Sequence, residues 1–173
     1  MIDLKTHIRN IPGFPKPGVV FKDITPLLAH GPAFHAAVDQ FADRYGGRVD
    51  VVLGIESRGF IIGAAVAYSL GCGLVLVRKA GKLPAATYAT SYELEYGADT
   101  VEIHQDAFPR QSRVLVIDDL LATGGTARAA VELVKRLQGE VVECAFVIEL
   151  AFLGGRERLH PYEVFSLVSY KQE

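Results

Sequence analysis

The chain has 173 residues, of which 50% are hydrophobic and 22% are charged, a balance that suits a single globular domain with a sizeable core. Its formal net charge of −2 argues against nonspecific nucleic-acid binding, so we expect no nucleic-acid partner. Cys72 and Cys144 lie in apolar surroundings without metal-ligand spacing, which predicts buried free thiols. The N-terminal residues lack the pattern of a signal peptide. Both observations predict a location in the cytoplasm, where thiols stay reduced.

The N-terminal part of the chain holds short elements joined by irregular backbone. Residues 2–8 suit a short helix. Residues 11–18 hold three prolines and two glycines, which predicts an irregular, stiffened segment. Residues 19–21 predict a short extended piece.

Two helices flank a buried strand in the next part of the chain. Apolar residues recur at helical spacing in residues 31–45, which predicts an amphipathic helix. Residues 49–55 predict a buried strand of a parallel sheet, and residues 59–70 predict the helix that follows it. Arg58 would lie between them, at the sheet edge where α/β proteins bind ligands. Because a cation is unfavourable at a helix N-terminus, we expect Arg58 to face an anion; the alternative is an ordinary surface charge.

Residues 60–77 carry no charge over 18 positions, which is near the lower limit for a membrane-spanning helix. The segment contains Gly71 and Gly73, which are placed like a helix end followed by a new strand over residues 74–77. We therefore expect a helix and a buried strand here, and no membrane association.

Cations and then aromatic residues follow that strand. Arg78, Lys79 and Lys82 surround a glycine, as they would in a solvated turn or in an anion site. Residues 83–99 fit neither a helix nor a strand, and a long loop inside a compact domain is typically functional or mobile. We interpret this loop as a lid that excludes water; the alternative is a mobile loop with scattered carboxylates.

The most informative stretch is residues 113–126. It begins with an apolar run over residues 114–117, continues with two aspartates and a turn of small residues, and leads into a helical pattern. Strand, acidic pair, glycine-rich turn and helix in this order place backbone N–H groups and the positive end of a helix around an anion. The turn therefore predicts a phosphate site made of Ala122, Thr123, Gly124, Gly125 and Thr126.

The acidic pair, Asp118 and Asp119, would repel a phosphate unless it served another part of the same ligand. Carboxylates accept hydrogen bonds from vicinal hydroxyls, so a sugar phosphate satisfies both ends of the site. We expect a ribose 5-phosphate, beside which Arg78, Lys79 and Lys82 would neutralise a leaving pyrophosphate. The alternative is a solvent-facing strand end with an ordinary glycine turn.

Three further strands complete the predicted sheet. They cover residues 100–104, 141–150 and 164–168, and the last of them is expected at an edge. Residues 155–159 predict a short turn. The sequence has no internal repeat and no long linker, so we expect residues 1–173 to form one domain.

Residues 118–126, Asp-Asp-Leu-Leu-Ala-Thr-Gly-Gly-Thr, resemble the phosphoribosyl-pyrophosphate (PRPP) binding motif of the type I phosphoribosyltransferases, in the form found in adenine-specific members. Further blocks resemble the same subfamily, in the same order, at residues 14–26, 56–60, 78–84 and 92–97. The resemblance implies an α/β type I phosphoribosyltransferase fold: a central, mostly parallel sheet flanked by helices, with an N-terminal hood (residues 1–30) and a flexible catalytic loop (residues 83–99).

The resemblance also implies an activity in purine salvage, the transfer of the 5-phosphoribosyl group from PRPP to adenine, which gives AMP and pyrophosphate. Mg²⁺ would enter with PRPP without direct protein ligands, and the enzyme would be a homodimer. Glu95 would be the catalytic residue, either by managing the adenine proton or by holding a lid contact. Pyrophosphate would contact Arg58, Arg78, Lys79 and Lys82. Adenine would contact Val20, Phe21, Lys22 and Leu150.

Finer expectations follow from the same resemblance. The Glu56–Ser57 peptide is predicted to be cis. Arg78 would act either in its own subunit or across the dimer interface. The family commonly has Arg where this chain has Lys22, so we expect a backbone contact to adenine there and assign no role to the side chain. For Phe21, simple core packing is the alternative.

Two other functions share parts of this pattern. A transferase of the same fold for hypoxanthine, guanine or xanthine would place a lysine near the base oxygen, and the strand beyond Val141 offers none. A non-catalytic PRPP sensor that binds RNA or DNA would lack the lid or the basic residues, and both are present.

Overall fold

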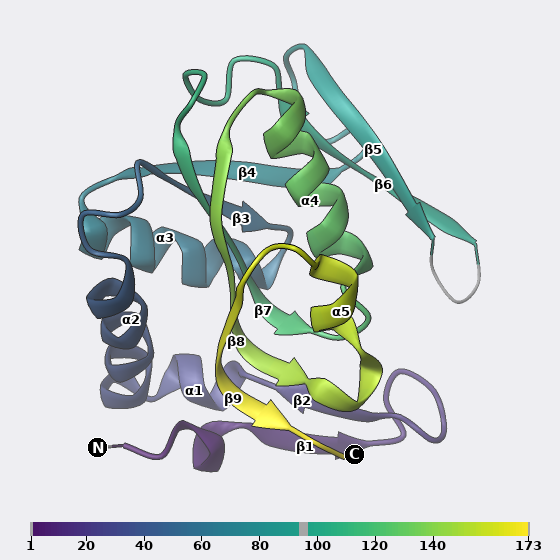
Figure 1. The fold of residues 1–173 in the computed structure, drawn as a ribbon. Helices are drawn as coiled ribbons and strands as arrows, with labels where there is room; N and C mark the ends of the chain where they lie inside the picture. The colour runs from purple at the N-terminus through teal and green to yellow at the C-terminus, as the bar shows by residue number, and fades with distance from the viewer. Residues whose placement is uncertain (1, 94–96, 173) are drawn as a thin grey trace.

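The core of the structure, a computed structural model that describes residues 2–93 and 97–172, is a seven-stranded sheet with the order β5-β6-β4-β3-β7-β8-β9 (Figure 1). Five of these strands are parallel to one another: β3 (Val51–Ile55), β4 (Gly73–Lys79), β7 (Arg113–Leu121), β8 (Glu140–Leu150) and β9 (Val164–Tyr170). At one edge, β5 (Thr87–Glu93) and β6 (Ala98–His104) form an antiparallel hairpin. The predicted α/β fold with a mostly parallel sheet is confirmed.

Helices cover both faces of this sheet (Figure 1). One face packs against α1 (Thr25–Ala29), α2 (Gly31–Tyr45) and α3 (Arg58–Leu70). The other packs against α4 (Gly125–Arg136) and α5 (Gly155–Leu159). Side chains of a strand alternate between the two faces, so Leu115 and Ile117 of β7 join the first core while Val114 and Val116 join the second. The amphipathic helices predicted before β3 and after residue 126 are confirmed, because their apolar positions are the buried ones.

The N-terminus forms a separate two-stranded sheet, β1 (Arg9–Pro12) with β2 (Val20–Asp23), after the 3-10 helix η1 (Leu4–His7). In Figure 1 this hairpin lies along β9, close to the C-terminus. An ion pair between Arg9 Nη2 and Asp23 Oδ2, at 2.6 Å, joins its open ends. The prediction that residues 11–18 are irregular is wrong at its start, because β1 includes Pro12; a two-stranded hairpin tolerates proline since both strands are edges.

The prediction that residues 83–99 form neither a helix nor a strand is wrong for β5 and for residues 98–99, with which β6 begins. Strand β5 alternates like any half-buried strand, but with Tyr88, Thr90 and Tyr92 on its buried side instead of aliphatic residues. Arg136 of α4 stacks on the Tyr88 ring at 4.2 Å from its centroid, which fixes the hairpin to the helix layer. Residues 155–159, predicted as a turn, form α5, with Leu159 buried in the core; the 3-10 helix η2 (Ala151–Leu153) precedes it.

The uncharged segment of residues 60–77 does not form one helix. Helix α3 ends before Gly71, which adopts a left-handed φ of 67°, and β4 begins at Gly73. Within the described ranges of the chain, no helix has the length and apolar character needed to cross a membrane. Both cysteines are free; Cys144 is buried as predicted, whereas Cys72 is only half-buried because it lies at this helix–strand junction.

Candidate functional site

Three neighbouring parallel strands, β4, β3 and β7, bring the predicted polar residues to one edge of the sheet. Their registers pair Ile55 with Val77 and Gly54 with Ile117. The residues that follow in each strand, including Arg78, Glu56 and Asp118, therefore lie side by side. The structure thus brings these side chains to one edge of the sheet, and their role in binding stays a prediction.

The small-residue turn encloses a pocket of about 90 Å³, lined by Asp118 and by residues 120–127. Two close backbone approaches hold the turn in place. A Cβ on Gly155 would lie 2.3 Å from the carbonyl oxygen of Ala122, and one on Gly124, which has a φ of 80°, would lie 2.8 Å from the carbonyl oxygen of Gly155. Helix α4 begins at Gly125, so its N-terminal amides point into this region. All five predicted phosphate-binding residues line this one pocket.

The two aspartates are not placed where the sequence suggested. They were expected at the end of their strand, but β7 continues past them to Leu121, because its pairing with β8 extends to Glu149. A charge within a buried strand requires a partner. Asp119, which is 5% exposed, accepts a hydrogen bond from Nε of Arg58 at the start of α3.

Asp118 is in a different environment from its neighbour. Its Oδ1 accepts the backbone N–H of Asp119 at 2.8 Å and lies against Gly59, where a Cβ would be 2.8 Å away. Protein atoms packed around the carboxyl and the adjacent charge of Asp119 raise the pKa of Asp118 well above its usual range. The two carboxyls thus form an asymmetric pair, one ion-paired and one that resists ionisation.

The basic residues expected to meet pyrophosphate are already paired with carboxylates. Glu56 accepts hydrogen bonds from Lys82 Nζ at 2.7 Å, from the backbone N–H of Lys79 at 3.0 Å and from Arg78 Nη2 at 3.4 Å. These donors, Lys82 first, lower the pKa of Glu56 to about 2. The Lys79 ammonium pairs with Asp99 of β6 at 3.0 Å. Arg78 Nη1 also donates to the carbonyl oxygen of Lys82 at 3.2 Å.

Sequence reasoning missed the role of Glu56 as the hub of this cluster. A signal was available, because Glu56 follows one predicted parallel strand and the basic run follows the next. Parallel register brings those two positions together. The Glu56–Ser57 peptide is cis, as the resemblance predicted.

The residues expected to contact adenine point to two different sides of β2. The ring of Phe21 faces the site: the Arg58 guanidinium lies 5.4 Å from its centroid, and Phe14 packs edge-on at 5.2 Å. Val20 and Lys22, one residue to each side, line a cavity on the opposite face. Leu150 ends β8, half-buried and paired in register with Tyr170.

The predicted catalytic residue, Glu95, lies outside the described residues. Strand β5, which precedes it in the chain, ends close to the phosphate pocket, since a Cβ on Gly125 would lie 3.2 Å from Cδ2 of Tyr92. Glu93 also approaches this glycine through its backbone oxygen.

Carboxylates near the site could supply oxygen ligands for a hard cation such as Mg²⁺. Among the described residues, however, no group of three or more ligating side chains is close enough together to hold a metal ion. Asp118 lines the pocket of the small-residue turn and Asp119 follows it in β7, so the described residues offer two carboxyls there and no complete metal site.

Comparison with known proteins identifies close relatives. Residues 28–172 match the phosphoribosyl transferase domain family. An adenine phosphoribosyltransferase from Syntrophotalea carbinolica is 59% identical over 171 residues, which cover 98% of this chain and 100% of the relative.

Solved structures agree with that match. The crystal structure of adenine phosphoribosyltransferase from Thermoanaerobacter pseudethanolicus superposes with a TM-score of 0.94 at 49% identity, covering 96% of this chain and 98% of that one. The enzyme from Saccharomyces cerevisiae, crystallised with an imino-altritol bisphosphate and adenine, gives a TM-score of 0.90 at 41% identity, covering 95% and 96% of the two chains.

Proposed function

The chain belongs to the phosphoribosyl transferase family, in its adenine phosphoribosyltransferase branch, and we propose that the edge formed by β4, β3 and β7 transfers the 5-phosphoribosyl group of PRPP to adenine. The products are AMP and pyrophosphate. The observation that carries this assignment is the phosphate-sized pocket lined by Asp118 and residues 120–127, which lies beside Asp119 and a basic cluster on one sheet edge.

PRPP would bind with its 5′-phosphate on Ala122–Thr126 and its two ribose hydroxyls on Asp118 and Asp119. The amides at the start of α4 are donors that need no rearrangement to meet phosphate oxygens. During transfer the bond from C1′ to the pyrophosphate oxygen breaks, a bond from C1′ to N9 of adenine forms, and adenine gives up its N9 proton. Positive charge grows on the ribose as the first bond breaks. The oxygen atoms of the two carboxyls, which carry negative partial charge, favour that developing cation.

The departing pyrophosphate carries the opposite charge. Arg58, Arg78, Lys79 and Lys82 lie on the same edge, and each has donors left beyond its present carboxylate bond. Pyrophosphate would therefore bind the donors that Glu56, Asp99 and Asp119 leave open, while these carboxylates hold the cations in place. Mg²⁺ entering with PRPP would supply further charge neutralisation of the phosphate oxygens.

Adenine would stack on Phe21, with Leu150 on its other side and the backbone of Val20 and Lys22 reading its edge. The position of the Phe21 ring beside Arg58 supports this placement. The side chain of Lys22 points away from it, which limits Lys22 to a backbone contact.

Glu95 is proposed as the catalytic residue on the loop of residues 83–99, by family resemblance. Replacing Glu95 with Gln should lower kcat while PRPP affinity is largely kept, because the change removes the charge and preserves the shape. A wild-type kcat in this variant would contradict the assignment.

We also propose a homodimer in the cytoplasm, in which residues 1–173 form one domain and residues 1–30 its hood. Exposed apolar side chains on α3 and β4 support the dimer: Ile61, Tyr68, Leu74 and Leu76. The two free cysteines support a reducing compartment. The family match that starts at residue 28 supports the hood as an addition to a common domain.

A base-competition assay tests the function. The purified chain is given PRPP, Mg²⁺ and equimolar adenine, hypoxanthine, guanine and xanthine, and the nucleotide products are separated. We expect AMP to dominate, with no product when PRPP or Mg²⁺ is omitted. Faster use of a 6-oxopurine would overturn the base assignment, and PRPP binding without any nucleotide would indicate a sensor.

A further inference from the structure

A buried ion pair joins helix α5 to the ends of two strands. Glu149, near the end of β8, is 5% exposed. Its carboxylate accepts two hydrogen bonds from Arg156 of α5, one from Nε at 3.0 Å and one from Nη2 at 2.7 Å. The hydroxyl of Ser166 in β9 donates to the same carboxylate at 2.8 Å, and Arg156 Nη1 donates to the carbonyl oxygen of Val164 at 2.6 Å. The Glu149–Arg156 pair is called the α5 clamp below.

The clamp is charged and fixed in orientation. The hydrogen bonds from Arg156 lower the pKa of Glu149 against the opposing effect of burial, so the carboxylate is ionised at neutral pH. A bidentate guanidinium–carboxylate pair sets both a distance and an orientation. Helix α5 has only five residues, of which Gly155 and Leu159 are buried, and a helix this short depends on contacts with the rest of the protein. The clamp therefore sets the position of the first turn of α5.

The clamped end of α5 is the end that supports the turn of residues 122–126. Arg156 directly follows Gly155, which packs against the carbonyl oxygen of Ala122 and whose added Cβ would lie 2.9 Å from Cδ1 of Leu121. Glu149 is paired in register with Leu121, the last residue of β7. The two members of the clamp thus lie next to the turn, one through α5 and the other through the sheet.

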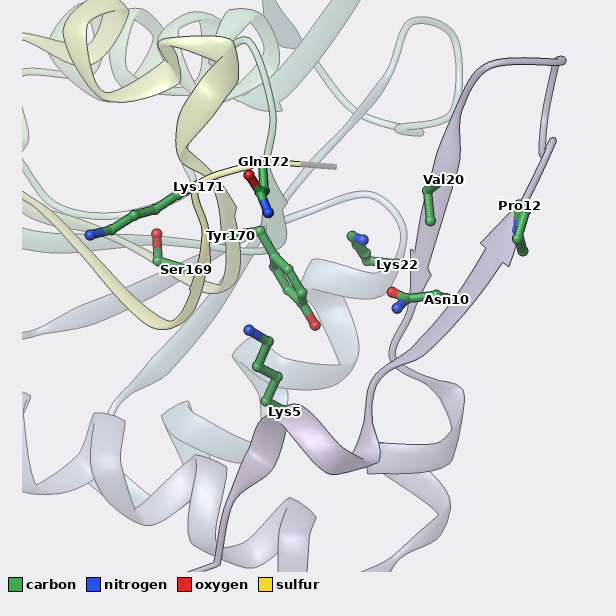
Figure 2. A pocket seen from close by; sticks show the side chains of 9 residues that line it. All are labelled: Lys5, Asn10, Pro12, Val20, Lys22, Ser169, Tyr170, Lys171 and Gln172. Atoms are coloured by element: carbon green, nitrogen blue, oxygen red, sulfur yellow. The ribbon is translucent and has the colours of Figure 1, made fainter.

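The proposed adenine contact of β8 lies on the opposite face of this strand. Neighbouring residues of a strand point to opposite faces, so Leu150 faces away from Glu149, toward the core below α2 and α3. Leu150 is paired in register with Tyr170, whose ring lies beside Lys22 of the N-terminal hairpin (Figure 2). The clamp is therefore connected to the phosphate end of the site and not to its adenine end.

From these contacts we infer that Glu149 and Arg156 are positioning residues for the phosphate turn, an inference that rests on the proposed function. Neither side chain lines the phosphate pocket. Both act through α5, which holds the Ala122 carbonyl and thereby the orientation of the amides that would meet the 5′-phosphate. Loss of the clamp should consequently weaken phosphate binding more than it slows the chemical step.

Glu149→Gln and Arg156→Lys test this role in the full chain. Gln removes the charge at nearly unchanged shape, whereas Lys keeps the charge of Arg156 and loses its planar fork. We expect each variant to raise the KM for PRPP about tenfold, to lower kcat less than about threefold and to leave the KM for adenine within about twofold of the wild type. A wild-type KM for PRPP in either variant would overturn the inference.

Glu143→Gln is the matched control, because it breaks a pair of the same kind in the same strand. Glu143 is 2% exposed and accepts hydrogen bonds from Arg44 of α2 at 3.0 and 2.7 Å. It is paired in register with Leu115, near the beginning of β7 and away from the turn. We expect both Gln variants to unfold at lower urea concentration than the wild type, but only Glu149→Gln to raise the KM for PRPP. An equal rise in the two variants would overturn the inference.

Calorimetry separates this inference from the transferase assignment. AMP and adenosine differ only in the phosphate, so the ratio of their affinities reports on the turn without turnover. We expect Glu149→Gln to lower this ratio about tenfold and Glu143→Gln to keep it. A lowered ratio in a chain that makes no AMP from PRPP would support the clamp and refute the transferase assignment. An unchanged ratio in Glu149→Gln would refute the clamp, whatever the turnover.

Discussion

At the scale of single residues, Asp118 and Asp119 illustrate how adjacent, identical side chains acquire different properties. Alternation along β7 turns them to opposite faces of the strand. Asp119 meets Arg58, whereas Asp118 meets backbone and the packed glycine at the start of α3. The same substitution should therefore have different effects on stability at the two positions.

Asp118→Asn should leave stability at neutral pH unchanged or raised, and should lower turnover by about tenfold or more. The pKa of Asp118 is raised in the folded state, so keeping it ionised above its usual pKa costs folding free energy that Asn avoids. Urea unfolding at pH 7 and a steady-state assay measure the two effects. Turnover equal to that of the wild type would exclude hydroxyl binding by Asp118.

Asp119→Asn is the matched comparison. It removes the countercharge of Arg58, so we expect a loss of about 1–2 kcal/mol in the free energy of unfolding, moderated by the 41% exposure of the Arg58 side chain. Turnover should also fall. If both asparagine variants unfolded at the same urea concentration, the asymmetry of the pair would be refuted.

Glu56→Gln tests the carboxylate that holds the basic cluster. The pKa of Glu56 is depressed to about 2, so its ion pairs stabilise the fold above about pH 4.5 and this contribution is lost as the pH falls from there toward 2. The wild type should therefore lose stability in that interval, and the variant should lose less. Thermal unfolding between pH 2 and pH 6 provides the measurement.

Steady-state kinetics of the same variant show whether Glu56 acts by positioning the basic residues or takes part in the chemical step. Without Glu56 to hold them, Arg78 and Lys82 lose their fixed orientation, so the KM for PRPP should rise more than kcat falls. A variant that changed neither the pH profile nor the KM would leave Glu56 without a positioning role.

At the scale of elements, the phosphate turn depends on the start of α5, a helix that is remote in sequence. The contact is between backbones: Gly155 packs on the Ala122 carbonyl, and Gly124 packs on the Gly155 carbonyl. Neither contact leaves room for a Cβ. The geometry of the turn is thus set by two elements together.

Gly155→Ala should consequently weaken phosphate binding indirectly, by displacing the turn that holds the phosphate. Its Cβ would lie 2.3 Å from a backbone oxygen, so the turn must shift, at a cost of about 1–3 kcal/mol in stability and a rise of about tenfold in the KM for PRPP. Gly31→Ala is the control, because no atom lies within 4 Å of its added Cβ. Equal KM values for the two variants would show that α5 does not support the turn.

At the scale of the whole molecule, one face remains apolar after folding. Ile61 and Tyr68 of α3 are 47% and 90% exposed, and Leu74 of β4 packs beside Gly63 of the same helix while staying 38% exposed. Neighbouring apolar groups exposed on two packed elements are typical of an interface between subunits.

Tyr68→Asp should shift the chain from twice the monomer mass to the monomer mass in light scattering, because burying the new charge in the interface is unfavourable. Ile2→Asp, at an exposed apolar residue near the N-terminus, should leave the mass unchanged. A Tyr68→Asp chain that still has the wild-type mass would place any subunit contact elsewhere.

Most of the helices and strands of this protein could be predicted from its sequence. Apolar periodicity predicted the parallel strands and α2, α3 and α4, and the glycine-rich stretch after β7 predicted that residues 122–126 gather at one site, because these signals are local. The sequence did not predict strand β5, because polar and aromatic residues alternate in it instead of apolar ones. It also did not predict the short helices α1 and α5, which depend on packing against the rest of the protein.

The sequence by itself determined the family, the fold class and which residues are available for the chemistry, since spacing and residue type are local properties. The tertiary structure alone decided that Arg58 pairs with Asp119, that Glu56 gathers Arg78 and Lys82, and that Lys22 turns its side chain away from Phe21. Such pairings depend on strand register and on which face of a strand a residue occupies, and both are fixed only when distant segments pack together.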